Sequence, residues 1–186
     1  RQAYYNLGKV LKRLGKSEEA VISYKKAIEF KHNYVKAYNN LGITLNDLGE
    51  YQDAIINYRK ALGLRPGHAE TYNNLGNALN GLGKSEEAIT CYNKAIKLKP
   101  DNAEAYYNLG RIVKRLGNLE RAIVFYKKAI EINAYFAKAY NNLGNALIVL
   151  GKSETEAITN YNKAMELKPD YAEAYWNRHG LTKDIA

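Results

Sequence analysis

The chain is short of the residues that build disulfide scaffolds, rigid loops and membrane spans. Cys91 is the only cysteine among 186 residues, which excludes an internal disulfide, and proline occurs three times. No apolar run approaches the roughly 18 residues that a membrane-spanning helix needs. We therefore expect a soluble protein without membrane insertion, and the lone cysteine favours a cytoplasmic one, since thiols stay reduced there.

Patterns for catalysis and metal binding are missing too. The three histidines, His32, His68 and His179, are far apart in the sequence, and none stands at helical spacing from Cys91. The sequence contains neither a pair of metal ligands nor a glycine-rich phosphate loop. We expect no catalytic residues, no metal site, no cofactor and no enzymatic activity.

Acidic residues are outnumbered, because 19 of them face 28 lysines and arginines, for a formal net charge of +9. Such an excess attracts acidic partners over long range. It is equally typical of a lysine-rich, solvated helical surface that has no specific ligand. The position of the charges therefore matters more than their sum.

What the chain does contain is an internal repeat. The tripeptide Asn-Leu-Gly occurs five times at intervals of 34 residues, beginning at Asn6, Asn40, Asn74, Asn108 and Asn142. Repeats of this length cannot bury their apolar face alone and must stack on their neighbours. We predict a single array over residues 1–186, with repeats at 1–34, 35–68, 69–102, 103–136 and 137–171 and a partial repeat or capping helix at 172–186.

Each repeat is predicted to form a hairpin of two helices, which makes the fold class all-α. Apolar residues from Tyr4 to Leu14 recur at intervals of three and four, as on one face of an α-helix, and Gly15 ends that helix. The candidate N-caps of the second helix are Ser17, Ser85 and Ser153. The prolines, which stop the second helix, are Pro66, Pro100 and Pro169.

A glycine lies inside each first helix: Gly8, Gly42, Gly76, Gly110 and Gly144. An exposed glycine in this position costs about 1 kcal/mol relative to alanine. We therefore expect the glycine to allow the paired helix to approach closely, with Ala20 and its equivalents as the small residues opposite. Two tyrosine columns, which begin at Tyr4 and Tyr24, are expected to fill the core.

Several columns together resemble the tetratricopeptide repeat (TPR) family: Tyr4-x-x-Leu7-Gly8, Ala20, Tyr24, Ala27 and a following proline in three repeats. The resemblance covers nearly the whole chain. It implies a right-handed α-solenoid of five helical hairpins plus a capping helix, with the first helices lining a concave surface. One departure is an additional residue near Thr155, which we place in the turn between the helices of repeat five.

Binding is expected on the face of the first helix opposite its packing stripe, at residues 2, 5, 6, 9, 12 and 13 and their equivalents. One column of this face is asparagine throughout: Asn6, Asn40, Asn74, Asn108, Asn142 and Asn177. Because a carboxamide both donates and accepts hydrogen bonds, this column can hold the main chain of an extended peptide. It is similar to the asparagine ladder in the TPR superhelix of O-linked N-acetylglucosamine transferase. The alternative is that asparagine is merely common before Leu-Gly in this family.

Further candidate peptide-binding residues flank the column: Lys9, Lys12, Arg13, Asn77, Arg111, Lys114, Arg115 and Asn145. The positive charges gather in repeats one and four, so we expect the bound segment to be acidic near both ends. A solvated face without a specific ligand is the competing interpretation.

The leading hypothesis is a non-catalytic scaffold that binds a protein or an extended peptide. One alternative is a single-stranded RNA-binding repeat, with stacking rings at Tyr5, Tyr107 and Trp176. Nucleic acid is disfavoured because an array that reads bases varies its reading positions, whereas the asparagine column is constant. A second alternative is the substrate-recognition arm of a larger enzyme. The uncovered apolar side of the first helix fits either self-association through uncovered repeat ends or a longer parent protein.

Overall fold

The computed structural model describes residues 1–183, with side chains through Gly180. Over these residues the chain forms eleven α-helices and no β-strand, so the predicted all-α class is confirmed. The helices are α1 (Gln2–Arg13), α2 (Ser17–Glu29), α3 (Val35–Asp47), α4 (Tyr51–Leu64), α5 (Ala69–Gly81), α6 (Ser85–Leu98), α7 (Ala103–Arg115), α8 (Leu119–Ile132), α9 (Ala137–Val149), α10 (Glu154–Leu167) and α11 (Ala172–Lys183). Residues 184–186 of the predicted capping segment lie outside the described residues.

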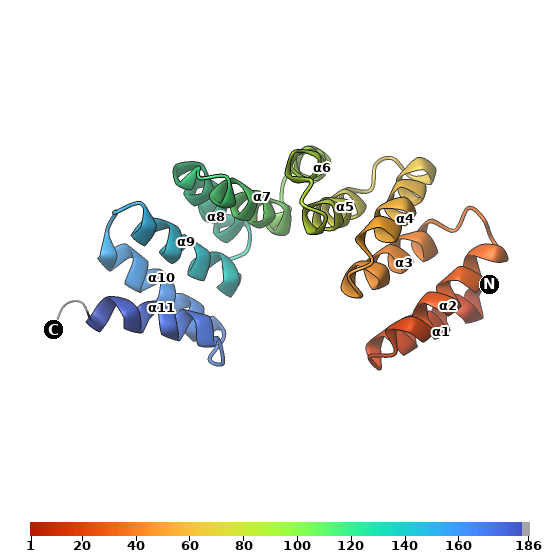
Figure 1. Cartoon of the computed structure of the whole chain (residues 1–186), viewed down its shortest axis with the longest axis horizontal. Coiled ribbons are helices and arrows are strands. Elements are labelled where there is room, and N and C mark those ends of the chain that lie inside the picture. The colour runs from red at the N-terminus through yellow and green to blue at the C-terminus, as the bar shows by residue number, and fades with distance from the viewer. Residues whose placement is uncertain (184–186) are drawn as a thin grey trace. The chain divides into compact units, whose positions relative to one another are not determined.

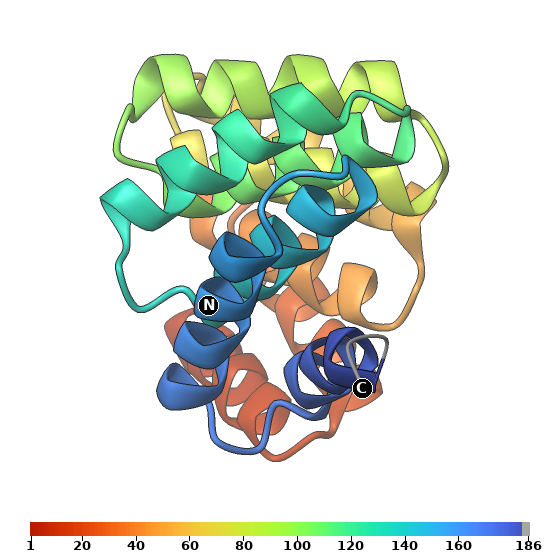
Figure 2. The same cartoon turned by 90° about the vertical axis from the view of Figure 1, so that its left-hand side faces the viewer.

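The helices pair into hairpins, and the hairpins pack within two compact units, one of which spans Arg1–Pro100 while the other begins at Asp101. In the first unit α1 pairs with α2, α3 with α4 and α5 with α6 (Figure 1). In the second unit α7 pairs with α8 and α9 with α10, and α11 lies beside α10 (Figure 2). Within each unit, a later first helix also packs on the second helix of the hairpin before it, as α3 does on α2 and α9 on α8. This is the arrangement of a helical-hairpin solenoid.

The turn inside each hairpin is closed by a glycine in the left-handed region, as predicted for the column of Gly15. Gly83, with a φ of +77°, is representative. It lets the Lys84 N–H reach back to the Leu79 carbonyl at 2.9 Å, which satisfies one of the last carbonyls of α5. The same positive φ recurs at Gly15, Gly49, Gly117 and Gly151.

The predicted serine caps are wrong at two of three positions. Ser17 and Ser85 are the first residues of α2 and α6, and the capping positions belong to Lys16 and Lys84, whose side chains make no cap bond. The tight glycine turn starts the second helix one residue early. Ser153 does cap α10, because its hydroxyl accepts the Glu156 N–H at 3.2 Å. There the turn, residues 150–153, is one residue longer than the turn at 116–118, which confirms the place of the additional residue.

Close approach at the mid-helix glycines is confirmed, but the partner differs from the prediction. A Cβ placed on Gly76 would lie 2.6 Å from Cε1 of Tyr92, far inside van der Waals contact. The same contact joins Gly8 to Tyr24, Gly42 to Tyr58, Gly110 to Tyr126 and Gly144 to Tyr161. The residue opposite is therefore the tyrosine ring of the second helix, while Ala20 and its equivalents are buried elsewhere in the hairpin.

The two tyrosine columns differ in burial. Tyr24 and its equivalents are at most 2 % exposed, as predicted for core residues. The column of Tyr4 is largely half-buried, and Tyr175 is 40 % exposed, so the prediction of a second core column is wrong apart from Tyr38. These rings lie near the ends of the hairpins, where Tyr4 stacks on Phe30 with a centroid distance of 5.6 Å.

The outward face of α1 is apolar and exposed. Leu7 is 47 % exposed, whereas the equivalent Leu41 is 2 % and Leu75 5 % exposed, because a preceding second helix covers those two. Val10 and Leu14 extend the same face. Self-association through this face stays a prediction. Among the described helices, none combines the length and the hydropathy that crossing a bilayer requires.

Replacement of Gly76 by alanine tests the tyrosine contact. We expect Gly76→Ala to lower the free energy of unfolding by about 1–2 kcal/mol, because the overpacking cost outweighs the gain in helix propensity. The matched control is Gly63→Ala in α4, where an added Cβ meets nothing within 4 Å. The control should stabilise the protein by ~0.5 kcal/mol in chemical denaturation. Equal effects of the two substitutions would contradict the contact.

Alkaline titration tests the burial of the same rings. Burial raises the pKa of Tyr24 and of Tyr161 to about 12 from the usual 10.0. Phenolate therefore forms more readily in the unfolded chain, and the stability present below pH 10 is lost as the pH rises toward 12. We expect helical circular dichroism to fall in this window together with a cooperative rise in phenolate absorbance. Complete ionisation near pH 10 with retained helicity would show that the rings are accessible.

Candidate binding surface

The asparagine column connects neighbouring hairpins within each unit. In the first unit Asn40 Nδ2 donates to the Tyr5 hydroxyl at 3.1 Å, and in the second unit Asn142 Nδ2 donates to the Tyr107 hydroxyl at 2.9 Å. Asn177 Nδ2 donates to Asn141 Oδ1 at 3.0 Å. Each of these carboxamides is therefore held from the hairpin before it.

Members of the column differ in accessibility. Asn6 is exposed and accepts a bond from Gln2 at 3.1 Å, whereas Asn108 is only 9 % exposed. The half-buried members are Asn40, Asn74, Asn142 and Asn177. A carboxamide has two N–H donors and an oxygen with two acceptor sites, so the bond of Asn40 or Asn142 to the tyrosine hydroxyl uses one N–H and not the oxygen. The half-buried members are the ones best suited to a ligand.

The asparagines of the neighbouring column, at position five of their repeats, lie buried in the interface between hairpins, where the helical projection predicted an open surface. Asn39, Asn73 and Asn141 are 8 %, 2 % and 0 % exposed. Asn39 Oδ1 accepts from the Thr71 hydroxyl at 2.8 Å. The next first helix packs on this side of the helix, which a projection of one helix does not show. In the five full repeats this column contains only tyrosine and asparagine, whose side chains both end in a hydrogen-bonding group. That pattern was the sequence signal for hydrogen bonds between hairpins.

Position nine supplies a second contact with the core. The predicted binding residues Asn77 and Asn145 accept hydrogen bonds through Oδ1 from the hydroxyls of Tyr92 and Tyr161, each at 2.7 Å. Their oxygens are thus engaged inside the hairpin, and what they offer a ligand is mainly the amide donor.

The basic cluster of repeat one is partly neutralised. Lys12 Nζ lies 2.9 Å from a carboxylate oxygen of Asp47, and Lys9 Nζ lies 6.0 Å from the centroid of the Tyr5 ring. Arg13 is exposed. Nearby, a groove of about 470 Å³ crosses α1, α3 and α5 and is lined by Tyr5, Asn39, Asn40, Lys36, Glu70 and residues of the turns before α3 and α5.

The basic cluster of repeat four surrounds a smaller pocket. About 270 Å³ in volume, it is lined by Arg111, Lys114, Arg115, Tyr126 and Asn142. The Arg111 guanidinium lies 5.9 Å from the centroid of the Tyr107 ring. The sequence-predicted residues Arg111, Lys114, Arg115 and Asn142 are thus brought together around one cavity.

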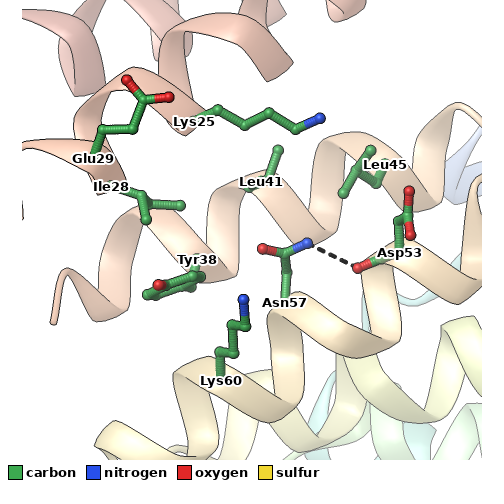
Figure 3. A pocket seen from close by; sticks show the side chains of 9 residues that line it. All are labelled: Lys25, Ile28, Glu29, Tyr38, Leu41, Leu45, Asp53, Asn57 and Lys60. Atoms are coloured by element: carbon green, nitrogen blue, oxygen red, sulfur yellow. Dashed lines mark hydrogen bonds between the residues drawn. The ribbon is translucent and has the colours of Figure 1, made fainter. Parts of the chain in front are cut away.

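A third pocket, not expected from the sequence, lies between the second helices α2 and α4, with the first helix α3 also lining it. Figure 3 shows its side chains, which come from α2, α3 and α4 and enclose about 370 Å³. Its floor is apolar, with Ile28, Leu41 and Leu45, and its rim carries two lysines and two carboxylates. Asn57 Nδ2 is bonded to the Asp53 carbonyl at 2.8 Å. Charges of both signs on the rim give no preference for a charged ligand.

Two of the rings proposed for RNA stacking are packed into the protein. Tyr5 lies 5.1 Å from Tyr34 between ring centroids, and Tyr107 lies 4.8 Å from Phe136. Their hydroxyls accept the asparagine bonds described above. Trp176 is 78 % exposed and lies on a different helix. Of the three rings proposed to stack on bases, Tyr5 and Tyr107 are therefore already packed against other rings of the protein.

Burial raises the pKa of the Cys91 thiol to about 11, so it is protonated at neutral pH. The part of the chain that the structure describes holds no group of three histidine, cysteine or acidic residues placed to bind a metal ion.

Family models match most of the sequence. A TPR repeat model matches residues 11–47, 76–117 and 154–181. One tetratricopeptide repeat model matches residues 35–68 and 103–136. A second tetratricopeptide repeat model matches residues 57–90 and 125–157. A search of curated protein sequences finds no significant match.

Solved structures of similar proteins share the fold. The crystal structure of MamA is 32 % identical, covers 89 % of this chain and 96 % of its own, and has a TM-score of 0.75. PilF of Pseudomonas aeruginosa is 22 % identical, and the match covers 99 % of this chain and 83 % of PilF, with a TM-score of 0.88. YrrB, described as a TPR protein with an unusual peptide-binding site, is 24 % identical, with coverages of 95 % and 90 % and a TM-score of 0.70.

Removal of one hydroxyl tests the bond between hairpins. We expect Tyr107→Phe to lower the free energy of unfolding by about 0.5–1.5 kcal/mol, because the half-buried Asn142 loses its acceptor. Tyr106→Phe is the matched control, since Tyr106 is also half-buried and makes a ring contact with Phe125. Chemical denaturation measures both. If the control costs as much as Tyr107→Phe, the hydroxyl bond contributes nothing to the stack.

Proposed function

This chain belongs to the tetratricopeptide repeat family, and from that premise we propose that its first helices bind an extended peptide along the asparagine column. The TPR repeat is typically a non-catalytic interaction module, and TPR proteins bind protein or peptide partners. A role as a protein-interaction scaffold therefore follows from the family. The peptide and its place on the first helices are the further step.

The observation that carries the proposal is the fixed orientation of Asn40 and Asn142. Each is held by a tyrosine hydroxyl of the preceding hairpin, at 3.1 Å and 2.9 Å, and each keeps its carbonyl oxygen for another partner. An extended peptide presents an amide donor and a carbonyl acceptor at every residue. Because the carboxamides are already oriented, binding costs less side-chain entropy than it would with free rotamers.

Recognition of the main chain makes the surface tolerant of the peptide sequence. Each hydrogen bond contributes about 0.5–1.5 kcal/mol net, so several bonds are needed for a useful affinity. The groove beside Asn40, with a volume of about 470 Å³, offers room for side chains of the peptide. Acidic side chains are favoured where Lys9, Arg13, Arg111 and Lys114 lie, and this preference should weaken with salt.

Selected peptides test the asparagine column. The probe is a fluorescein-labelled dodecapeptide obtained by display selection on the purified chain. We expect Asn40→Ala and Asn74→Ala each to weaken its binding by about 1 kcal/mol, roughly fivefold, in fluorescence polarisation. The matched controls, Asn93→Ala and Asn162→Ala, lie exposed on the second helices α6 and α10 and should leave binding unchanged.

N-methylation of single peptide amides separates main-chain from side-chain recognition. Methylation removes one donor and should weaken binding at the residues that meet the column, while alanine substitution of the peptide at those residues should have little effect. Binding that survives both asparagine substitutions and every N-methyl group would overturn the proposal.

A further inference from the structure

The hydroxyl of Tyr126 is the unusual member of the buried tyrosine column. It is shielded from solvent and has no hydrogen-bond partner among the described residues. The equivalent hydroxyls of Tyr92 and Tyr161 each donate at 2.7 Å to an asparagine oxygen at position nine. An unsatisfied buried hydroxyl costs stability, so a partner from outside the chain would be favoured there.

The difference arises from one residue. Position nine of repeat four is Arg111, where repeats three and five have Asn77 and Asn145. This change removes the acceptor from the hydroxyl and places a cation beside it. Burial raises the pKa of Tyr126, so the hydroxyl stays protonated and can donate its hydrogen to an acceptor.

The charges around this hydroxyl are less neutralised than their counterparts in repeat one. The triad of Lys9, Lys12 and Arg13 corresponds to Arg111, Lys114 and Arg115. Lys12 is paired with Asp47 at 2.9 Å. The position equivalent to Asp47 in the next repeat is Val149, which cannot pair with Lys114. Within the described residues neither Arg111 nor Lys114 forms an ion pair with a carboxylate.

We infer that the pocket lined by Arg111, Lys114, Arg115, Tyr126 and Asn142 binds a doubly charged oxyanion, which in the peptide complex is a phosphorylated side chain. The peptide part of this inference rests on the proposed function. A phosphate monoester carries a charge of about −1.5 to −2 at neutral pH and three strong acceptor oxygens. The pocket offers guanidinium, ammonium, hydroxyl and amide donors to those oxygens.

A carboxylate matches the pocket less well. It carries a single negative charge and two oxygens, so it offers the donors of the pocket less charge and fewer acceptor atoms than a phosphate does. Arginine binds both groups, but a second negative charge strengthens its attraction to each cation of the pocket. Preference for phosphate over carboxylate is therefore the specific expectation.

Small blocked amino acids test the pocket without a peptide groove. The probes are N-acetyl-phosphoserine N-methylamide, N-acetyl-aspartate N-methylamide and inorganic phosphate, titrated at constant ionic strength and followed by NMR of the arginine and asparagine side chains. We expect the phosphoserine probe to bind at least about tenfold more tightly than the aspartate probe. Inorganic phosphate should shift the same signals.

Three variants locate the binding. Arg111→Asn restores the pairing seen at Asn77 and should weaken the phosphoserine probe about tenfold or more without lowering the melting temperature. Val149→Asp supplies Lys114 with the partner that Lys12 has, and should also weaken it; Val149 is 67 % exposed, so the fold tolerates the change. Arg121→Asn removes an exposed arginine that does not line the pocket and should have no effect.

Equal affinity for the phosphoserine and aspartate probes, or affinity unchanged by both Arg111→Asn and Val149→Asp, would overturn the inference. Binding of inorganic phosphate without the phosphoserine probe would also overturn it, since the source would then be a free anion. These outcomes leave peptide binding by the asparagine column untouched. Conversely, loss of peptide binding does not affect the titration with small probes.

Discussion

The contact between a tyrosine ring and a glycine determines how each hairpin is built. The ring of the second helix occupies the space that a Cβ of the first helix would fill, 2.6–2.7 Å from its ideal position in all five hairpins. This lets the two helices approach closely around a large buried side chain. In repeats three and five the hydroxyl then donates to the asparagine at position nine, one residue beyond the glycine. The packing constraint thus selects which residue of the binding surface meets a buried donor.

Polar contacts then set the register between hairpins within each unit. The hydroxyls of Tyr5 and Tyr107 accept hydrogen bonds from Asn40 and Asn142. Asn39 accepts one from the Thr71 hydroxyl. An apolar interface would permit sliding, whereas a half-buried hydrogen bond is lost when the helices shift. The same bonds orient the asparagines toward any ligand. In the function proposed above, stacking and peptide recognition therefore depend on the same side chains.

The sequence was sufficient for the hairpins, the glycine turns and the close approach at Gly76, because each depends on residues within one repeat. It was insufficient where a neighbouring hairpin decides the environment. Asn141, fully buried, was expected in the groove. Helical periodicity gives the face of a residue, but the element that covers this face belongs to another repeat. Recognition of the pocket at Arg111 needed both the sequence and the structure. The sequence shows that Arg111 and Val149 depart from the residues at the equivalent positions of other repeats, and the structure shows that the Tyr126 hydroxyl lacks a hydrogen-bond partner among the described residues.

A crystal structure of the chain with a selected peptide tests the central claim most directly. The account predicts an extended peptide on the first helices, with its main chain bonded to the carboxamides of Asn40 or Asn142 while these keep their bonds to Tyr5 and Tyr107. A peptide seated among the second helices, in the pocket of Figure 3, with the asparagine column uncontacted, would contradict it.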